Sequence, residues 1–242
     1  MQNQFDPRVR SADPAIAVGV PQVARDAGLR SYMLRVYNYM ASGVLLTGIV
    51  AMLFANSGMA AQVMATPLRW LIIFAPLAFV FGMSFGVNRM QTSTLQALFW
   101  GFAVAMGLSM STIFLVYTGT SIAQTFFAVS GAFLGLSLYG YTTKKDLSGF
   151  GTFLIMGVVG LLIAMVINMF VQSTAMMFAI SAIGVLLFAG LTAYDTQKIK
   201  SMYAHIAGTD MMGKAAIMSA LTLYLDFINM FQFMLSFMGD RR

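Results

Sequence analysis

The segment Ser219-Ala-Leu-Thr-Leu-Tyr-Leu-Asp-Phe-Ile-Asn-Met-Phe-Gln-Phe-Met-Leu-Ser236 decides the fold class of this chain. It is long and apolar enough to cross a bilayer as an α-helix, yet it carries Asp226 near its middle. On a helix its polar residues fall within an arc of about 140°; they are Ser219, Thr222, Asp226, Asn229, Gln232 and Ser236. Because a polar stripe on a membrane helix turns away from lipid, we expect other helices to enclose this one.

The aspartate in this segment has two interpretations. An ionised Asp at the centre of a membrane helix costs about 2.5–3.5 kcal/mol on insertion scales, so its presence requires a reason. Asp226 is either a neutral or paired packing residue, or it lines a path for ions or protons.

The composition of the whole chain agrees with a membrane protein. Of its 242 residues, 59% are hydrophobic and 9% are charged, and the mean hydropathy is +0.80. A soluble domain carries about 25% charged residues and cannot bury so much apolar surface. The absence of Cys excludes disulfides and thiolate metal sites, and we interpret the single His205 as an ordinary loop residue. The net charge of +6 fits basic residues facing anionic membrane lipid better than a nucleic-acid partner.

The chain divides into a tail and one membrane domain. Residues 1–30 are polar and include Pro7, Pro14 and Pro21, which predicts a flexible cytoplasmic tail without a cleaved signal peptide. Residues 31–242 form the second part, an all-α domain with seven apolar segments that each approach the ~20 residues needed to span a bilayer. The segments are 33–55, 68–88, 95–117, 121–142, 150–171, 175–197 and 215–238, and a linker of about 17 residues precedes the last one.

The basic residues predict the orientation. With seven spans, eleven of them lie on the side of the N-terminus: Arg8, Arg10, Arg25, Arg30, Arg35, Arg89, Lys144, Lys145, Lys198, Lys200 and Lys214. Only Arg69, Arg241 and Arg242 lie on the other side. The positive-inside rule therefore places the N-terminus in the cytoplasm and the C-terminus outside. A last helix that enters and leaves on one side would instead place the C-terminus inside.

Two further patterns concern packing. Gly82-x-x-x-Gly86 and Gly131-x-x-x-Gly135 predict surfaces on which helices approach closely. Pro76, inside the second apolar segment, predicts a bend and a possible hinge, because proline removes one backbone hydrogen bond.

A second aspartate, Asp195, ends the sixth apolar segment in Gly190-Leu-Thr-Ala-Tyr-Asp195-Thr-Gln-Lys198-Ile-Lys200. Alone, it is a solvated residue at the membrane surface. If it faces Asp226, two carboxylates about 4 Å apart repel by about 4 kcal/mol at an effective dielectric constant near 20. Such a pair shares a proton and titrates as a unit.

These motifs resemble the Bax-inhibitor-1-like (TMBIM) family. The resemblance rests on residues 190–200, on Ala220-Leu-Thr-Leu-Tyr-Leu-Asp226-Phe-Ile-Asn-Met-Phe, and on Tyr141-Thr-Thr-Lys-Lys-Asp-Leu-Ser148. The stretch Ile113-Phe-Leu-Val-Tyr-Thr-Gly-Thr-Ser-Ile-Ala-Gln124-Thr-Phe-Phe is similar to that of proteobacterial members. The resemblance covers residues 30–238 and leaves the tail outside.

The resemblance implies a seven-helix protein of the bacterial inner membrane, with the last helix central and a pH-sensitive calcium leak. Its two-aspartate sensor falls on Asp195 and Asp226, and its latch arginine, hydrogen-bonded to the first aspartate, falls on Arg89. Two effects of pH then oppose each other: repulsion between the carboxylates opens the bundle as pH rises, whereas the latch fails when Asp195 is protonated. The acid-enhanced leak of the family favours the latch.

The oxygen atoms near the aspartates suit a cation in transit. Asp195 and Asp226 are the candidate ligands of a weak, transient calcium site, because Ca²⁺ prefers about six to eight oxygen ligands and water must supply the rest. The pore-lining candidates are Thr192, Thr222, Asn229 and Gln232. We expect no cofactor; calcium or another cation is the permeant ion.

Two rival functions remain. An intramembrane aspartyl protease also uses two aspartates, but its Gly-x-Gly-Asp motif is replaced here by Leu223-Tyr-Leu-Asp226, and no proline follows Pro76. We therefore expect no enzyme. Bacterial members of the family are also associated with the membrane-bound AAA protease of protein quality control. A role as its modulator or partner, through the tail 1–30, is the alternative function.

Overall fold

The computed structural model describes the backbone of residues 22–242 and the side chains of residues 26–242. Most of the predicted tail 1–30 lies outside this part of the chain. Helix α1 starts at Gln22, so residues 22–30 are helical rather than part of an extended tail. No proline follows Pro21 in this stretch, and nothing else there interrupts a helix.

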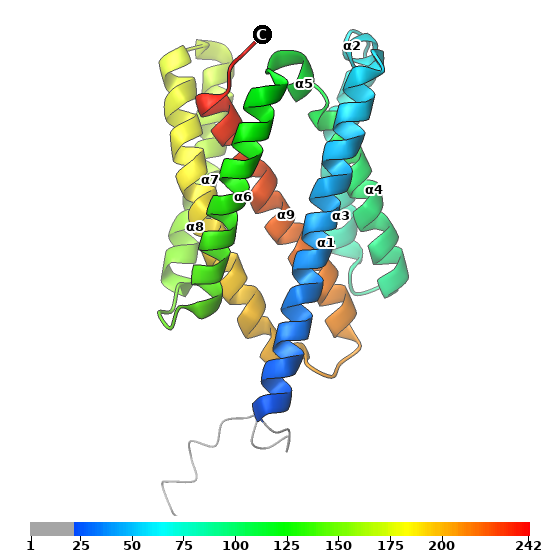
Figure 1. Ribbon diagram of the computed structural model, residues 1–242, viewed down its shortest axis with the longest axis vertical. Helices are drawn as coiled ribbons and strands as arrows, with labels where there is room; N and C mark the ends of the chain where they lie inside the picture. Colours follow the sequence, from blue (N-terminus) through cyan, green and yellow to red (C-terminus); the bar gives the residue numbers. More distant parts are fainter. Residues whose placement is uncertain (1–21) are drawn as a thin grey trace, which may run out of the picture.

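The described residues form helices joined by short turns (Figure 1). In chain order they are α1 (Gln22–Asn56), α2 (Met59–Met64), α3 (Leu68–Gly86), α4 (Thr92–Met110), α5 (Ile113–Val116), α6 (Gly119–Thr142), α7 (Ser148–Val171), α8 (Thr174–Ile206) and α9 (Met211–Met238). Seven stretches are long and apolar enough to cross a membrane, with α4 and α5 counted together and α2 lying between two of them. The predicted all-α, seven-span fold is confirmed.

The predicted linker before the last span is wrong. Helix α8 does not end at the last apolar residue but continues to Ile206, so only residues 207–210 connect it to α9. The residues after Asp195 are polar, which ends the apolar pattern, but no proline or glycine interrupts the helix before Gly208. Accordingly, His205 lies in the last turn of α8 and not in a loop.

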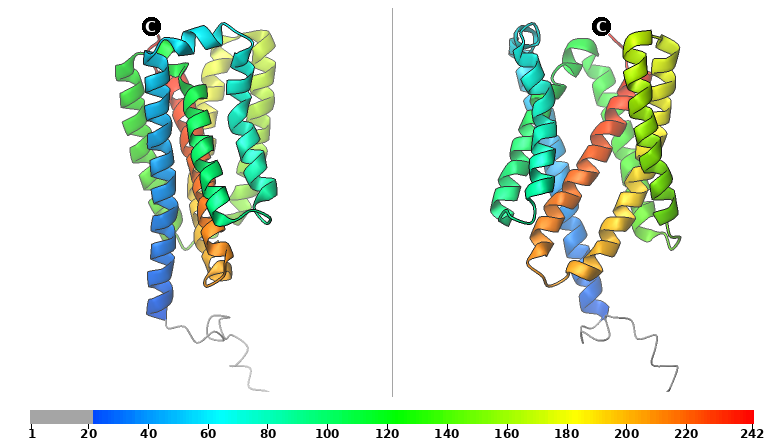
Figure 2. Two further views of the ribbon diagram at one scale, coloured as in Figure 1. Left: turned by 90° about the vertical axis from the view of Figure 1, so that its right-hand side faces the viewer. Right: turned by 180° about the vertical axis from the view of Figure 1, so that it is seen from behind.

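The last helix crosses the whole bundle. In Figures 1 and 2, α9 starts at the end of the molecule where α1 begins and finishes at the opposite end. There the residues after α9 pair with the α5–α6 turn: the Thr118 amide donates to the Asp240 carbonyl (3.0 Å) and the Arg242 amide donates to the Val116 carbonyl (2.9 Å). The beginning of α1 and the end of α9 therefore lie at opposite ends of the bundle, and the last helix does not turn back to the end where it began.

The packing around α9 ties the bundle together. This helix lies against α1, α4, α6 and α8, and 56% of the residues in its most apolar 18-residue stretch are buried. Tyr224 is the anchor: its fully buried ring lies 5.0 Å from that of Phe102, and its hydroxyl is 2.6 Å from Thr47 Oγ1 of α1. By contrast, α3 packs mainly on α4 and α7 packs mainly on α8. In each of these two helices only 11% of the residues in the corresponding stretch are buried.

The glycine pairs singled out in the sequence do not lie at helix contacts. A Cβ placed on Gly82, Gly131 or Gly135 would meet no atom within 4 Å. Close approach occurs instead at other glycines. A Cβ on Gly140 of α6 would overlap the backbone of Ala193 in α8, and one on Gly107 of α4 would lie 2.8 Å from the Thr47 carbonyl oxygen. The spacing of two glycines shows that a helix has a small-residue surface, but not that a neighbour packs there.

We predict that Gly140→Ala destabilises the protein and that Gly131→Ala on the same helix does not. The first change forces α6 away from α8, at a cost of about 1–3 kcal/mol. The second adds a methyl group in open space and improves helix propensity by about 0.5–1 kcal/mol. Thermal unfolding in detergent measures both, and equal melting temperatures for the two variants would contradict the packing described.

We predict further that the two ends of the bundle face opposite sides of the membrane, with the beginning of α1 in the cytoplasm. The chain contains no Cys, so single cysteines report on position. A membrane-impermeant maleimide applied to intact cells should label Ser57→Cys and Arg242→Cys but not Lys145→Cys. Permeabilised cells, the control, should show labelling at all three positions. Labelling of Lys145→Cys alone in intact cells would reverse the orientation.

Candidate functional site

The polar end of α8 meets a different neighbour at almost every position. Tyr194 lies over Gly151 of α7, where any side chain would overlap its ring. Thr196 Oγ1 is 3.0 Å from Ser137 Oγ of α6, and Ser137 in turn is hydrogen-bonded to the Tyr37 hydroxyl of α1. This chain of hydroxyl groups fixes the rotation of α8, and with it the direction of Asp195.

Asp226 is buried in the bundle. Only 4% of the residue is exposed, and its Oδ2 atom is buried without a hydrogen-bond partner among the described residues. Two residues earlier on α9, Tyr224 lies on the opposite side of the helix and bonds Thr47 of α1, whereas Ser219 lies two turns earlier on the same side, with its Oγ 3.1 Å from the Tyr32 hydroxyl of α1. The Asp226 carboxyl group therefore points away from Thr47 and, at its own level of the helix, toward Asp195 of α8.

The structure brings Asp195 and Asp226 together. Their carboxyl groups come within hydrogen-bonding reach of each other, and Asp195, which is half-buried, also feels the positive charge of Lys198. An ionised carboxylate only accepts hydrogen bonds, so a hydrogen bond within this pair requires that one carboxyl group keeps its proton. The contact on which the sequence left two possibilities open is present, and it can bind one proton between two helices.

A clamp next to the pair was not recognised in the sequence. Gln197 Nε2 donates to the Lys145 carbonyl (2.7 Å), and Gln197 Oε1 accepts from the Leu147 amide (2.9 Å). Lys200 Nζ donates to the Tyr141 carbonyl (2.7 Å) and lies 5.0 Å from the centre of the Tyr141 ring. Gln197 and Lys200, two and five residues after Asp195, thus hold the α6–α7 turn. The sequence motifs at 141–148 and 190–200 contain the residues on both sides of this contact, so their joint occurrence could have predicted it.

The pore-lining candidates separate into two groups. Asn229 and Gln232 line a cavity of about 430 Å³ between α7, α8 and α9. Ser181, Ser236 and Asn168 add further polar atoms to this cavity, and Ser181 Oγ donates to Ser236 Oγ (3.1 Å). Asn168 and Ser181 were missed because each is a single polar residue in a long apolar run.

The two threonines do not line that cavity. Thr192 is fully buried, and its hydroxyl donates to the Phe188 carbonyl of its own helix (2.8 Å). The Thr222 hydroxyl likewise donates to the Met218 carbonyl (3.2 Å). Both lie one turn before an aspartate on the same helix, so they flank the carboxyl pair rather than the cavity.

Arg89 lies apart from the carboxyl pair. It is exposed in the turn between α3 and α4, and its backbone amide donates to the Gly86 carbonyl (2.9 Å). Within residues 26–242 no hydrogen bond or ion pair joins it to Asp195; Lys198 is the cation that acts on that aspartate. The latch remains a prediction, and it requires an arrangement of α3 other than the one described.

The donor set near the pair is small. Within the described residues no group of three or more His, Cys, Asp or Glu side chains is placed to hold a metal ion. Besides the two carboxyl groups, the side-chain oxygens within one helical turn along α8 and α9 include the amide oxygen of Asn229, whose Nδ2 donates to the Leu225 carbonyl (2.8 Å), and the hydroxyls of Thr192, Tyr194, Thr196 and Thr222.

These features define a polytopic α-helical membrane protein with an acidic pair between its last two helices. The family model described as "Inhibitor of apoptosis-promoting Bax1" matches residues 29–242. An uncharacterised protein of Rickettsia prowazekii is 50% identical, over 90% of this chain and 92% of that protein. The inner membrane protein YbhL of Escherichia coli is 46% identical, over 89% of this chain and 94% of its own length. The chain belongs to the Bax inhibitor-1-like family, as the motifs predicted.

We predict that Gln197→Ala loosens the α6–α7 turn. The substitution removes two hydrogen bonds worth about 0.5–1.5 kcal/mol each, so it should lower thermal stability and speed trypsin cleavage after Lys144 and Lys145. Ser201→Ala, one turn further along α8, is the control, because that hydroxyl bonds only the Lys198 carbonyl of its own helix. Cleavage of both variants at the rate of the unmodified protein would show that the clamp does not hold the turn.

Proposed function

We propose that this protein is a pH-sensitive cation leak channel of the bacterial inner membrane, with calcium as a permeant ion and Asp195–Asp226 as its sensor. The observation that carries the proposal is the contact of these two carboxyl groups, one of them almost fully buried. Ionised acidic groups inside a membrane are costly and are found where protons or ions move. A pair that holds one proton changes its charge with pH and alters the interaction between two packed helices.

The surroundings of the pair support a path rather than a storage site. The cavity of about 430 Å³ is lined by the Asn229, Gln232 and Ser236 end of the polar stripe, on the C-terminal side of Asp226. Its polar groups are amides and hydroxyls, which solvate a cation without holding it tightly. Weak coordination of this kind favours conduction, because an ion must leave as readily as it enters.

In this proposal acid opens the channel. When α3 carries Arg89 to the ionised Asp195, the arginine closes the path; protonation of Asp195 releases it. Helix α3 can make such a movement because it packs mainly on α4 and has Pro76 in its interior. In this proposal the released form has Arg89 exposed, as it is in the arrangement described. The loop carboxylate Asp146 takes no part, since hydrogen bonds from the Ser148 hydroxyl and amide lower its pKa and keep it ionised.

We expect Asp195→Asn/Asp226→Asn to remove the pH dependence of calcium flux into proteoliposomes. A single titrating step changes the flux by at most about tenfold per pH unit, and the double variant should vary by less than about twofold over the same range. Asp210→Asn is the matched control, because Asp210 is exposed and makes no capping hydrogen bond at the start of α9. An unchanged pH profile in the double variant would refute the sensor.

A second variant separates the latch from simple repulsion. Arg89→Gln should leak at neutral pH as the unmodified protein does in acid, because nothing then holds Asp195. If flux instead rises with pH and Arg89→Gln has no effect, repulsion between the carboxylates is the gate. Cleavage of a membrane peptide by the unmodified protein, lost in the double variant, would contradict the non-enzymatic proposal.

The alternative role, as a modulator or partner of the membrane-bound AAA protease, rests on the tail, most of which lies outside the described residues. Deletion of residues 1–21 distinguishes the two roles. Calcium flux that survives the deletion while protease coupling is lost would assign them to separate parts of the chain.

A further inference from the structure

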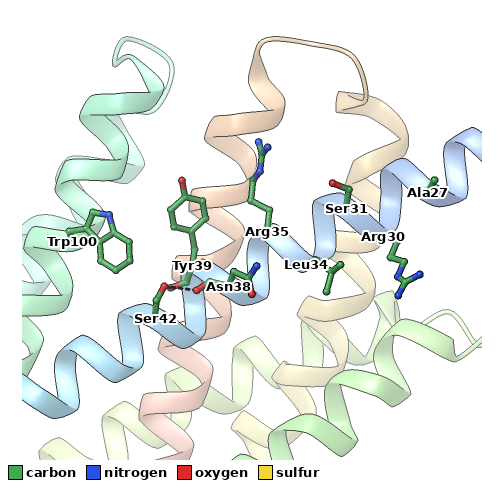
Figure 3. A pocket seen from close by; sticks show the side chains of 9 residues that line it. All are labelled: Ala27, Arg30, Ser31, Leu34, Arg35, Asn38, Tyr39, Ser42 and Trp100. Atoms are coloured by element: carbon green, nitrogen blue, oxygen red, sulfur yellow. Dashed lines mark hydrogen bonds between the residues drawn. The ribbon is translucent and has the colours of Figure 1, made fainter.

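A second cavity lies on the outer surface of α1, away from the carboxyl pair. It is a groove of about 750 Å³ that runs along one face of this helix and ends at Trp100 of α4 (Figure 3). Its lining residues are Ala27, Arg30, Ser31, Leu34, Arg35, Asn38, Tyr39, Ser42 and Trp100. Nothing in the proposed leak mechanism uses these residues.

The groove changes character along its length. Figure 3 shows the two arginines toward the start of α1, and Tyr39 and Trp100 at the other end of the groove. Ala27 and Ser42 are fifteen residues apart, which corresponds to about 22 Å along a helix. One end therefore offers positive charge and hydrogen-bond donors, and the other offers aromatic surface.

The charges in the groove lack a partner within it. Of the described residues that line it, none is acidic. Both Arg30 and Arg35 are exposed, and Asp26, one turn before Arg30, is not part of the lining. The two guanidinium groups project to different sides of α1, and Arg35 lies on the side of Tyr39 (Figure 3). An unpaired arginine favours an anion with several oxygen atoms, above all a phosphate, which it binds through paired hydrogen bonds.

The position of the groove at the membrane boundary favours the phosphate of a lipid headgroup over a soluble phosphate. Arg30 and Arg35 bracket residue 33, where the apolar part of α1 begins, so they lie at the boundary between the bilayer and water. Tyr39 lies further along α1 toward the bilayer interior, and Trp100 of α4 lies beside it, with 6.2 Å between the ring centres. Leu34, between Arg30 and Arg35, is 52% exposed. An occupant must therefore be anionic at one end and apolar at the other.

We propose that the groove formed by α1 and Trp100 binds one anionic phospholipid, with its phosphate at Arg35 and its upper acyl chains along Tyr39 and Trp100. Arg30, five residues nearer the start of α1, adds positive charge at the headgroup end. Ser31 and Asn38 add hydrogen-bond donors beside the phosphate. Basic pockets at the faces of membrane helices recognise anionic headgroups in this way, through charge at the interface and an apolar wall below it. The lipid would brace α1 against α4.

The two tryptophans of the chain make the proposal measurable. In a Trp70→Phe background, Trp100 is the single tryptophan and reports from inside the groove. The full-length protein is placed in vesicles in which either phosphatidylglycerol or phosphatidylcholine carries bromine high in its acyl chains. Quenching of Trp100 then measures which lipid occupies the groove, at equal mole fractions of the two.

We expect phosphatidylglycerol to be preferred by about tenfold. In the Arg30→Gln/Arg35→Gln variant this preference should disappear, so that the two lipids quench Trp100 about equally. Lys144→Gln/Lys145→Gln is the matched control: both lysines are exposed at the same end of the bundle, the change in charge is the same, and neither residue lines the groove. This control should keep the preference.

Three results would overturn the proposal. Equal quenching by the two lipids in the unmodified background would show that the groove does not select an anionic headgroup. Loss of the preference on addition of inorganic phosphate would identify a site for a soluble anion. If neither lipid quenches Trp100 in the full-length protein but both do so after deletion of residues 1–21, the start of this chain occupies the groove.

Discussion

A carboxyl group buried in the interior of a membrane protein needs either a proton or a partner, and the contact between Asp195 and Asp226 supplies both to one site. A proton shared by the two carboxyl groups would lower the charge of the pair, and their contact joins α8 to α9, the two helices that pack together most extensively. Two polar contacts near it fix the directions of these helices. Ser137 and Thr196 set α8 against α6, and Tyr224 sets α9 against α1.

The apolar pattern predicted the spans well because the bilayer imposes a length and a composition on each of them. The bounds outside the bilayer were less predictable, since no such constraint acts there. Helix α8 extends to Ile206 through Lys198 and Lys200, which an apolar window counts as the end of a span. The glycine pattern failed for a similar reason: Gly131 and Gly140 are equivalent in a sequence, and only the neighbouring helix distinguishes them.

The acidic pair was predictable in its residues but not in its contact. The polar stripe on the last span showed that Asp226 faces protein, and the position of Asp195 allowed the two to meet. Whether they do depends on the tilt of α8 and α9 and on the short connection at 207–210, neither of which a sequence pattern contains. The cavity next to the pair was only half predictable. Its α9 side belongs to the stripe, whereas Asn168 comes from an otherwise apolar helix.

The distribution of packing indicates how such a bundle can respond to a proton without unfolding. Helices α1, α4, α6 and α8 all lie against α9, with ring contacts such as Phe133–Phe227 (5.6 Å between centres) filling the interior. The carboxyl pair is part of this tightly packed group, so its geometry can stay constant while its charge changes. The helices with the least buried surface, α3 and α7, lie on opposite sides of that group (Figures 1 and 2). Movement of α3 disturbs mainly its contacts with α2 and α4, and movement of α7 mainly those with α8. In the proposed mechanism the acidic pair and the weakly held outer helix are therefore separable parts: the pair sets the pH at which the charge changes, and the outer helix is a part with few buried contacts to break when it moves.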